Sequence, residues 1–167
     1  MPVPHPAKEP AFLTIRSGGP FSWFSVTGAI DTPELHSRDA QVGLSTYGSK
    51  PLPFIVPAEY THVEVRRNSG GVARWYLDTL PQTQIGSLAF TGETAGTGPT
   101  LLRWSGPRRT FTYTLDGNEN HSGLMVSDAQ CRYMSADREG TLRGRLTMPA
   151  AGYVMVRSDG PWALRSA

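Results

Sequence analysis

The feature that most constrains the fold of this chain is an internal repeat. Four short landmarks within residues 39–77 recur, in the same order, within residues 128–164. The matching pairs are Asp39-Ala40-Gln41 with Asp128-Ala129-Gln130, Val56-Pro57-Ala58 with Met148-Pro149-Ala150, Val63-Glu64-Val65-Arg66 with Val154-Met155-Val156-Arg157, and Trp75-Tyr76-Leu77 with Trp162-Ala163-Leu164. The copies are offset by 89, 92, 91 and 87 positions, measured as 128 − 39, 149 − 57, 157 − 66 and 162 − 75. Because order and spacing both persist, the repeat predicts two copies of one small β fold joined in tandem.

Short strands are the expected elements. The chain has 167 residues with 18 Gly and 14 Pro, which is typical of many strands joined by tight turns. Residues 110–115, Thr-Phe-Thr-Tyr-Thr-Leu, alternate threonine with apolar side chains and predict a half-buried antiparallel strand. Further strands are predicted at Ala11–Arg16, Phe54–Val56, Thr61–Arg67, Ala73–Leu80, Thr100–Trp104, Gly123–Ser127, Arg132–Ser135, Thr141–Met148, Tyr153–Arg157 and Trp162–Arg165. No stretch has helical periodicity long enough to predict a helix.

The repeat also predicts the domain organisation. Residues 1–10 are expected to be a flexible arm, residues 11–85 the first sandwich and residues 100–167 the second. Residues 86–99 contain four glycines among small polar residues and are expected to be a linker or loop. A looser match aligns Phe24, Val26 and Gly28 with Tyr113, Leu115 and Gly117, again offset by 89 positions (113 − 24).

Cysteine usage and the N-terminal residues bear on the compartment. The chain has one cysteine, Cys131, so it cannot form an internal disulfide and does not need an oxidising compartment. Residues 1–10 lack the charged start and apolar run of a signal peptide. No run approaches the roughly 18 apolar residues of a membrane helix. We therefore expect a cytoplasmic protein without a membrane partner.

The charge is unevenly distributed. Residues 1–99 hold 7 basic and 8 acidic residues, a net charge of −1, whereas residues 100–167 hold 9 basic and 6 acidic residues, a net charge of +3. The second copy is therefore the better candidate for contact with an anion.

The second copy resembles a known family of β-sandwich modules. The resemblance covers residues 101–165 and rests on three stretches and a final strand. These are Phe111-Thr-Tyr-Thr-Leu-Asp-Gly117, Leu124-Met-Val-Ser-Asp-Ala-Gln130, Pro149-Ala-Ala-Gly-Tyr-Val-Met-Val-Arg157 and Gly160-Pro161-Trp162. Together they are similar to bacterial pre-peptidase C-terminal domains. The resemblance implies a jelly-roll-like, non-enzymatic module of the kind that binds glycans or other partners.

One position departs from the family pattern. The glycine that usually follows the aspartate turn is Cys131 in this chain. A residue with a Cβ atom resists positive φ, so the geometry of this turn is expected to differ.

No catalytic or cofactor motif stands out. His62 and Glu64 share one face of a predicted strand, but no third or fourth zinc ligand can be named, so a solvated face is favoured. The segment 116–121 has oxygen ligands at alternate positions but lacks the glycine and the final acid of an EF-hand, so a hairpin turn is favoured. Cys131 is expected to be an inert small apolar side chain. A phosphate loop of the Gly-x-x-x-x-Gly-Lys type is absent. We expect no enzyme activity, no metal and no cofactor.

The remaining signal is arginine interleaved with aromatic residues in the second copy. The guanidinium fork suits phosphate, and exposed aromatic rings stack on unpaired bases. The candidate nucleic-acid-binding residues are Arg103, Arg108, Arg109, Arg132, Tyr133, Arg143, Arg145, Tyr153 and Arg157. If residues 141–148 and 153–157 pair as a hairpin, four of these residues form one outward patch: Arg143, Arg145, Tyr153 and Arg157. Many of the aromatics are also expected in the core, and the matching places of Trp75 and Trp162 suit a structural role.

The sequence thus predicts an all-β fold of two related, antiparallel, jelly-roll-like sandwiches in tandem. Its expected function is non-enzymatic binding of single-stranded DNA or another single-stranded nucleic acid, for which the DNA-damage response is one setting. The first alternative is a glycan-binding or cell-surface adhesion module, in which Asp116, Asn118 and Asn120 would contact the sugar. The second alternative is a structural component of a larger assembly.

Overall fold

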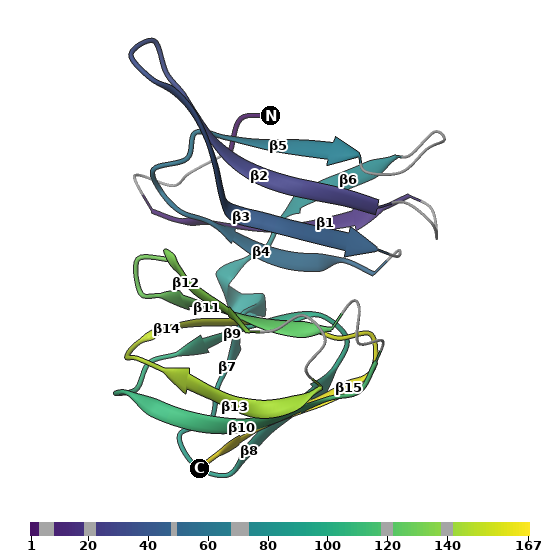
Figure 1. The fold of residues 1–167 in the computed structure, drawn as a ribbon, viewed down its shortest axis with the longest axis vertical. Coiled ribbons are helices and arrows are strands. Elements are labelled where there is room, and N and C mark those ends of the chain that lie inside the picture. The colour runs from purple at the N-terminus through teal and green to yellow at the C-terminus, as the bar shows by residue number, and fades with distance from the viewer. Residues whose placement is uncertain (4–8, 19–22, 48–49, 68–73, 118–121, 138–141) are drawn as a thin grey trace. The chain divides into compact units, whose positions relative to one another are not determined.

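The described part of the chain is almost entirely strand. The computed structural model describes residues 1–3, 9–18, 23–47, 50–67, 74–117, 122–137 and 142–167. In these residues there are strands β1 to β15 and a single 3-10 turn, η1 (Gln82–Gln84), which confirms the predicted all-β class. No described helix has the length and apolar character needed to cross a lipid bilayer. The chain divides into two compact units, Met1–Leu80 and Pro81–Ala167 (Figure 1).

The first unit consists of two three-stranded antiparallel sheets, with strand orders β4-β1-β6 and β3-β2-β5. Alternate side chains of each sheet point inward, and Ile15, Phe24, Val26 and Phe54 are buried. The strand bounds are β1 (Ala11–Ser17), β2 (Trp23–Asp31), β3 (His36–Tyr47), β4 (Leu52–Val56), β5 (His62–Arg67) and β6 (Trp75–Thr79).

The first three residues are part of this unit. The Val63 amide donates a hydrogen bond to the Met1 carbonyl at 2.9 Å, and the Val3 amide donates to the Thr61 carbonyl at 2.9 Å. Val3 is buried. The prediction of a flexible arm is therefore wrong for residues 1–3, because the outer edge of β5 supplies backbone partners for them. Residues 4–8 of the predicted arm lie outside the described residues.

The described residues of the second unit form nine strands in two sheets, with orders β13-β10-β15-β8 and β12-β11-β14-β9-β7. The strand bounds are β7 (Gly86–Ser87), β8 (Glu93–Thr97), β9 (Thr100–Trp104), β10 (Arg109–Leu115), β11 (Gly123–Asp128), β12 (Tyr133–Asp137), β13 (Arg143–Met148), β14 (Gly152–Arg157) and β15 (Pro161–Ser166). When the eight strands from β8 onward are numbered one to eight, the sheets have the orders 6-3-8-1 and 5-4-7-2, which define a jelly roll. β7 adds to the second sheet by parallel pairing with β9.

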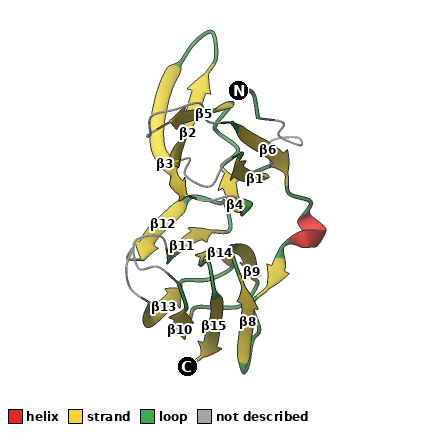
Figure 2. Ribbon diagram, turned by 90° about the vertical axis from the view of Figure 1, so that its right-hand side faces the viewer, coloured by secondary structure: helices red, strands yellow, loops and turns green. Residues whose placement is uncertain are grey.

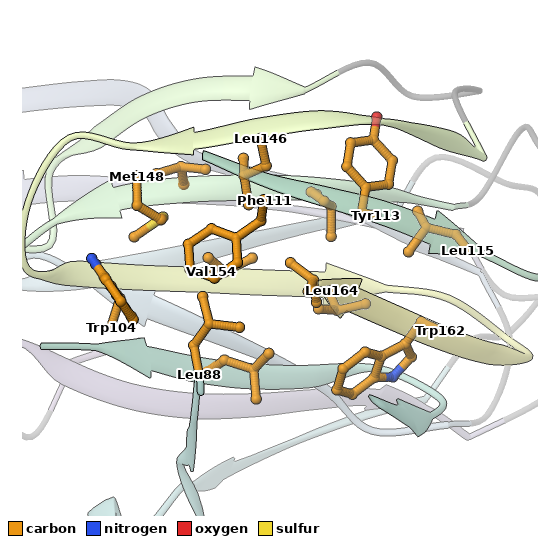
Figure 3. Packing of buried hydrophobic residues seen from close by; sticks show 14 residues of the cluster. Leu88, Trp104, Phe111, Tyr113, Leu115, Leu146, Met148, Val154, Trp162 and Leu164 are labelled. Atoms are coloured by element: carbon orange, nitrogen blue, oxygen red, sulfur yellow. The ribbon is translucent and has the colours of Figure 1, made fainter. Parts of the chain in front are cut away.

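The inner faces of these two sheets form one hydrophobic core (Figure 3). Trp104 is fully buried, and its ring meets that of Phe111 edge-on, with centroids 5.2 Å apart. The Trp104 indole Nε1 donates to the Pro107 carbonyl at 2.9 Å, so the polar atom of this buried ring is satisfied. Because the apolar residues of both sheets point into this core, their alternate side chains point out on opposite faces of the sandwich.

The two units share one pattern of strand pairing. In the first unit β1 lies between β4 and β6, and in the second β10 lies between β13 and β15. The registers agree as well: Ser17 pairs with Trp75 as Leu115 pairs with Trp162, and Leu13 pairs with Phe54 as Phe111 pairs with Leu146. In the other sheet, Val26 pairs with Val65 as Leu124 pairs with Val156. Trp75 and Trp162 therefore occupy equivalent places.

Three of the four sequence landmarks lie on equivalent strands, and one does not. Asp39-Ala40-Gln41 lies within β3, whereas Asp128-Ala129-Gln130 forms the end of β11 and the turn after it. The looser match of Phe24 with Tyr113 is also wrong, because the counterpart of β2 is β11 rather than β10. An alternating strand resembles any other alternating strand, so a period-two match does not fix which strands correspond.

The predicted linker at 86–99 is wrong as well, because β7 and β8 both lie in it and both pair with strands of the second unit. The division falls between Leu80 and Pro81. β8 lies against β15 at the edge of its sheet (Figure 2), whereas no described strand lies against the equivalent edge of β6.

Candidate nucleic-acid interface

The predicted binding residues do not form one patch. Arg143 and Arg145 lie on β13, in the sheet β13-β10-β15-β8. Arg103 lies on β9 and Tyr153 on β14, in the opposite sheet. The predicted hairpin of β13 with β14 is therefore wrong. β14 lies between β11 and β9 in one sheet, whereas β13 lies at the edge of the other sheet beside β10.

The outer face of the sheet β13-β10-β15-β8 carries threonine, alanine and arginine. One row across the strands is Arg145, Thr112, Arg165 and Glu93, and the next is Arg143, Thr114, Ala163 and Ala95. Thr110 and Thr147 pair beside the first row, and their hydroxyl oxygens are 3.1 Å apart. We call these ten residues the Thr-Arg face.

The arginines of the Thr-Arg face differ in their partners. The Arg165 guanidinium forms an ion pair with the Glu93 carboxylate at 2.8 Å. Arg143 and Arg145 are both exposed, and within the described part of the chain neither forms an ion pair. Two positive charges that have no ion-pair partner among the described residues therefore lie two residues apart on an edge strand.

A shallow hollow of about 650 Å³ lies at one end of this face. Ala163, Ala95 and Gly96 form part of its lining, and Arg143 and Asp116 contribute charged groups to it. The small side chains leave the hollow open, so an extended chain could approach Arg143 along the sheet.

Exposed aromatic rings are missing from this outer face among the described residues. The aromatic residues of its strands, Phe111, Tyr113 and Trp162, all point into the core and are buried. Base stacking on the Thr-Arg face therefore has no aromatic partner there, which departs from the expected combination of arginine and aromatic residues.

The other predicted group lies on the opposite sheet. Arg103 pairs directly with Tyr153 across β9 and β14, and Ser127 on β11 pairs with both Tyr153 and Tyr133. Arg103 is exposed, and Tyr153 is half-buried. Burial raises the pKa of the Tyr153 phenol above its ordinary value, the neighbouring Cys131 adds to the rise, and the positive charge of Arg103 opposes it.

The remaining predicted residues have other surroundings. The Arg132 side chain binds Asp128, with Nε 3.1 Å from Oδ2, and Arg108 is exposed in the loop before β10. The Arg109 guanidinium donates to the Phe90 carbonyl and, at 3.0 Å, to the Ser166 hydroxyl, so it ties the ends of the sheet together. Arg157 is only 8% exposed. Its inclusion in an outward patch was therefore wrong.

In the first unit, the polar residues considered for a metal site have partners close to them in the sequence. Glu64 forms an ion pair with Arg66, with Nε 2.9 Å from Oε1, and His62 Nδ1 lies 2.9 Å from the Thr61 hydroxyl. Among the described residues, no three His, Cys, Asp or Glu side chains are close enough to hold a metal ion. Residues 118–121 of the calcium-like segment 116–121, which include Asn118 and Asn120, lie outside the described part.

The sequence reasoning missed Arg165 and the threonines as members of the same face. The alternation of residues 161–166 placed Trp162 and Leu164 inward and thus Arg165 outward, so this signal was present. No signal in the sequence showed which strands lie side by side, because strand order depends on pairing between residues far apart in the chain.

No family model matches the chain, and no curated protein matches it.

Proposed function

We propose that the second unit is a non-enzymatic binding module for single-stranded nucleic acid and that the Thr-Arg face is its contact surface. The observation that carries the proposal is the pair Arg143 and Arg145, which are exposed, adjacent on one side of a strand and without an ion-pair partner among the described residues. We further propose that the protein is cytoplasmic and that it acts in the DNA-damage response.

The spacing of these groups suits a chain of phosphates. Side chains two residues apart on a strand are separated by about 6.8 Å, so the two guanidinium groups can meet successive anionic groups of an extended polymer. Threonine hydroxyls donate hydrogen bonds to phosphate oxygens in many nucleic-acid complexes, and Thr112 and Thr114 lie beside the two arginines.

The proposed mode is backbone contact rather than base reading. With the aromatic rings of these strands turned inward, the affinity would come from charge and hydroxyl groups. Such binding is weak, tolerant of sequence and steeply dependent on salt.

The test is a titration of labelled single-stranded DNA, duplex DNA and an oligosaccharide at about 50 and 200 mM salt, a range over which phosphate contacts lose much of their strength. We expect Arg143→Glu with Arg145→Glu to weaken single-strand binding at least tenfold. We also expect the slope of log affinity against log salt to become shallower by about 1.4, which corresponds to two phosphate contacts.

A matched control changes the net charge equally with residues that are not part of the Thr-Arg face. Arg74→Glu with Arg103→Glu reverses one exposed arginine on the first unit and one on the opposite sheet. If the control weakens binding as much as the first variant, the Thr-Arg face is not the contact surface. Wild-type binding that is indifferent to salt would reject nucleic acid as the ligand.

The first alternative follows from the resemblance of residues 101–165 to pre-peptidase C-terminal domains, which favours a glycan ligand. Of the polar residues that this alternative needs, Asp116 is exposed, and Asn118 and Asn120 lie outside the described residues. Binding of the oligosaccharide at both salt concentrations would support it. If the protein binds neither nucleic acid nor the oligosaccharide, the second alternative, a structural component of a larger assembly, is favoured.

A further inference from the structure

Among the described residues, the first unit has no counterpart of one edge strand of the second unit. In the second unit β8 pairs along the outer edge of β15, and five residue pairs from Pro161–Thr97 to Arg165–Glu93 form this ladder. β6 is the counterpart of β15, since both pair with the middle strand of their sheet in the same register. Among the described residues, no strand occupies the edge of β6 that β8 would cover.

The difference is visible in the exposure of equivalent side chains. Trp162 is 6% exposed and Leu164 is 1% exposed, whereas Trp75 is 36% exposed. Leu77, the counterpart of Leu164, is only half-buried. The inward side of β6 is therefore open in the first unit.

The backbone of β6 has donors and acceptors along the same edge. The Leu80 amide donates to the Phe12 carbonyl, and the Gly18 amide donates to the Arg74 carbonyl, so the even-numbered residues of this strand face β1. In an antiparallel strand the alternate residues face the other way, which directs the amides and carbonyls of Trp75, Leu77 and Thr79 outward. In the second unit the corresponding groups of β15 face β8, as the bond from the Ser166 amide to the Gly92 carbonyl shows.

The sequence of β8 indicates which residues an added strand needs along such an edge. Its Gly96 lies opposite Trp162, and a Cβ atom on Gly96 would come within 2.4 Å of the indole ring. The indole Nε1 also donates to the Gly98 carbonyl at 2.9 Å. A strand that covers this tryptophan therefore needs a glycine opposite the ring.

Charge distinguishes the open edge from the covered one. Glu93 of β8 forms an ion pair with Arg165, and the residue in the place of Arg165 on β6 is Asp78. Asp78 is exposed. Opposite charges across paired strands are favourable and like charges are not, so the occupant of the β6 edge needs a basic residue opposite Asp78.

We propose that the first unit binds an extended peptide by strand addition to β6, with a glycine opposite Trp75 and a lysine or arginine opposite Asp78. The peptide runs antiparallel to β6 and takes the place that β8 has in the second unit. Its main chain supplies the hydrogen bonds, and the two side-chain positions supply the selectivity.

The probe is a labelled peptide with the sequence of residues 91–99 and the substitution Glu93→Lys, added to the unmodified full chain. We expect fluorescence anisotropy to show binding, and the native peptide with Glu93 to bind about threefold to tenfold more weakly. A Gly96→Leu peptide should lose binding at least tenfold. Displacement of β8 from the second unit predicts the reverse charge preference, because there the residue faces Arg165.

Backbone methylation provides matched controls that leave the protein untouched. N-methylation at Thr94 and Gly96 blocks the amides that face the protein and should reduce affinity more than tenfold, whereas N-methylation at Ala95 and Thr97 should change it less than threefold. Hydrogen exchange should slow at the Trp75, Leu77 and Thr79 amides when the peptide binds.

Three results would overturn the proposal. The first is no binding of the Glu93→Lys peptide at millimolar concentration. The second is binding that is equally sensitive to both methylation patterns. The third is a dimer in sedimentation velocity that buries Trp75 without peptide, which would assign this edge to a second copy of the chain.

Discussion

Residue conformation is constrained most at Cys131. Its φ angle is 63°, and it is the only described residue other than glycine with a positive φ. The Cys131 amide donates to the Asp128 carbonyl at 2.9 Å, so this conformation closes the turn between β11 and β12. The sequence indicated that a Cβ atom would resist the turn geometry of the resembled family. Cys131 nevertheless adopts the left-handed conformation, and its thiol is buried.

We predict that Cys131→Gly is more stable than Cys131→Ala by about 1 kcal/mol. Both variants remove the thiol, but only glycine adopts the left-handed conformation without a penalty, which for other residues is about 1–2 kcal/mol. The free energy of unfolding in urea measures the difference. Equal stabilities would mean that the turn relaxes out of the left-handed region in the alanine variant.

At the scale of elements, the sequence predicted ranges for eleven of the fifteen described strands, without β2, β3, β7 and β8, and it did not predict which strands are neighbours. Alternation placed β10 correctly, and the ranges predicted for β1, β9 and β14 differ from the observed bounds by one residue or less. β8 was missed because its residues, Glu-Thr-Ala-Gly-Thr, include no aromatic side chain and no β-branched one except threonine. It is a strand because Gly96 fits beneath Trp162, and that contact joins residues 66 positions apart (162 − 96).

We predict that Gly96→Ala destabilises the second unit by about 1–3 kcal/mol, the usual range for an overpacked core site. The added methyl group would overlap an indole ring that is held by its hydrogen bond to Gly98. The neighbouring substitution Ala95→Ser, on the exposed side of the same strand, should change stability by less than about 0.5 kcal/mol. Urea unfolding of both variants tests the pair, and a tolerated Gly96→Ala would show that β8 can move away from the ring.

The candidate site was predictable only in part. Arg143 and Arg145 were assigned to a common exposed face from their i, i+2 spacing, and they lie on one. Their grouping with Tyr153 failed because a short connection such as residues 149–151 can lead either to a hairpin or to the opposite sheet.

At the scale of the whole molecule, the chain carries the same arrangement twice at different degrees of completion. The second unit has the eight strands of a jelly roll, and the first has the counterparts of six of them with residues 1–3 beside β5. The repeat in the sequence predicted this kinship. It could not show the added strands, because they have no partner in the other copy to align with.

We predict that equivalent tryptophans contribute unequally to stability. Trp162→Ala should destabilise its unit by about 3–5 kcal/mol, as expected for a buried tryptophan in a closed core. Trp75→Ala should have less than half that effect, because no described strand covers its ring. Native-state hydrogen exchange at amides of β10 and β1 reports on each unit separately. Equal losses in the two units would contradict the difference in closure.

The acidic side chain on the edge of β6 also bears on solubility. An edge that accepts a strand is a hazard in a concentrated solution, because copies of a protein can stack there into fibres. Antiparallel pairing of the β6 edges of two copies, centred on Asp78, would place the two Asp78 side chains directly opposite each other, with Cβ atoms about 4.5–5.5 Å apart, where like charges repel. Growth of an aggregate from this edge is therefore opposed by a single carboxylate.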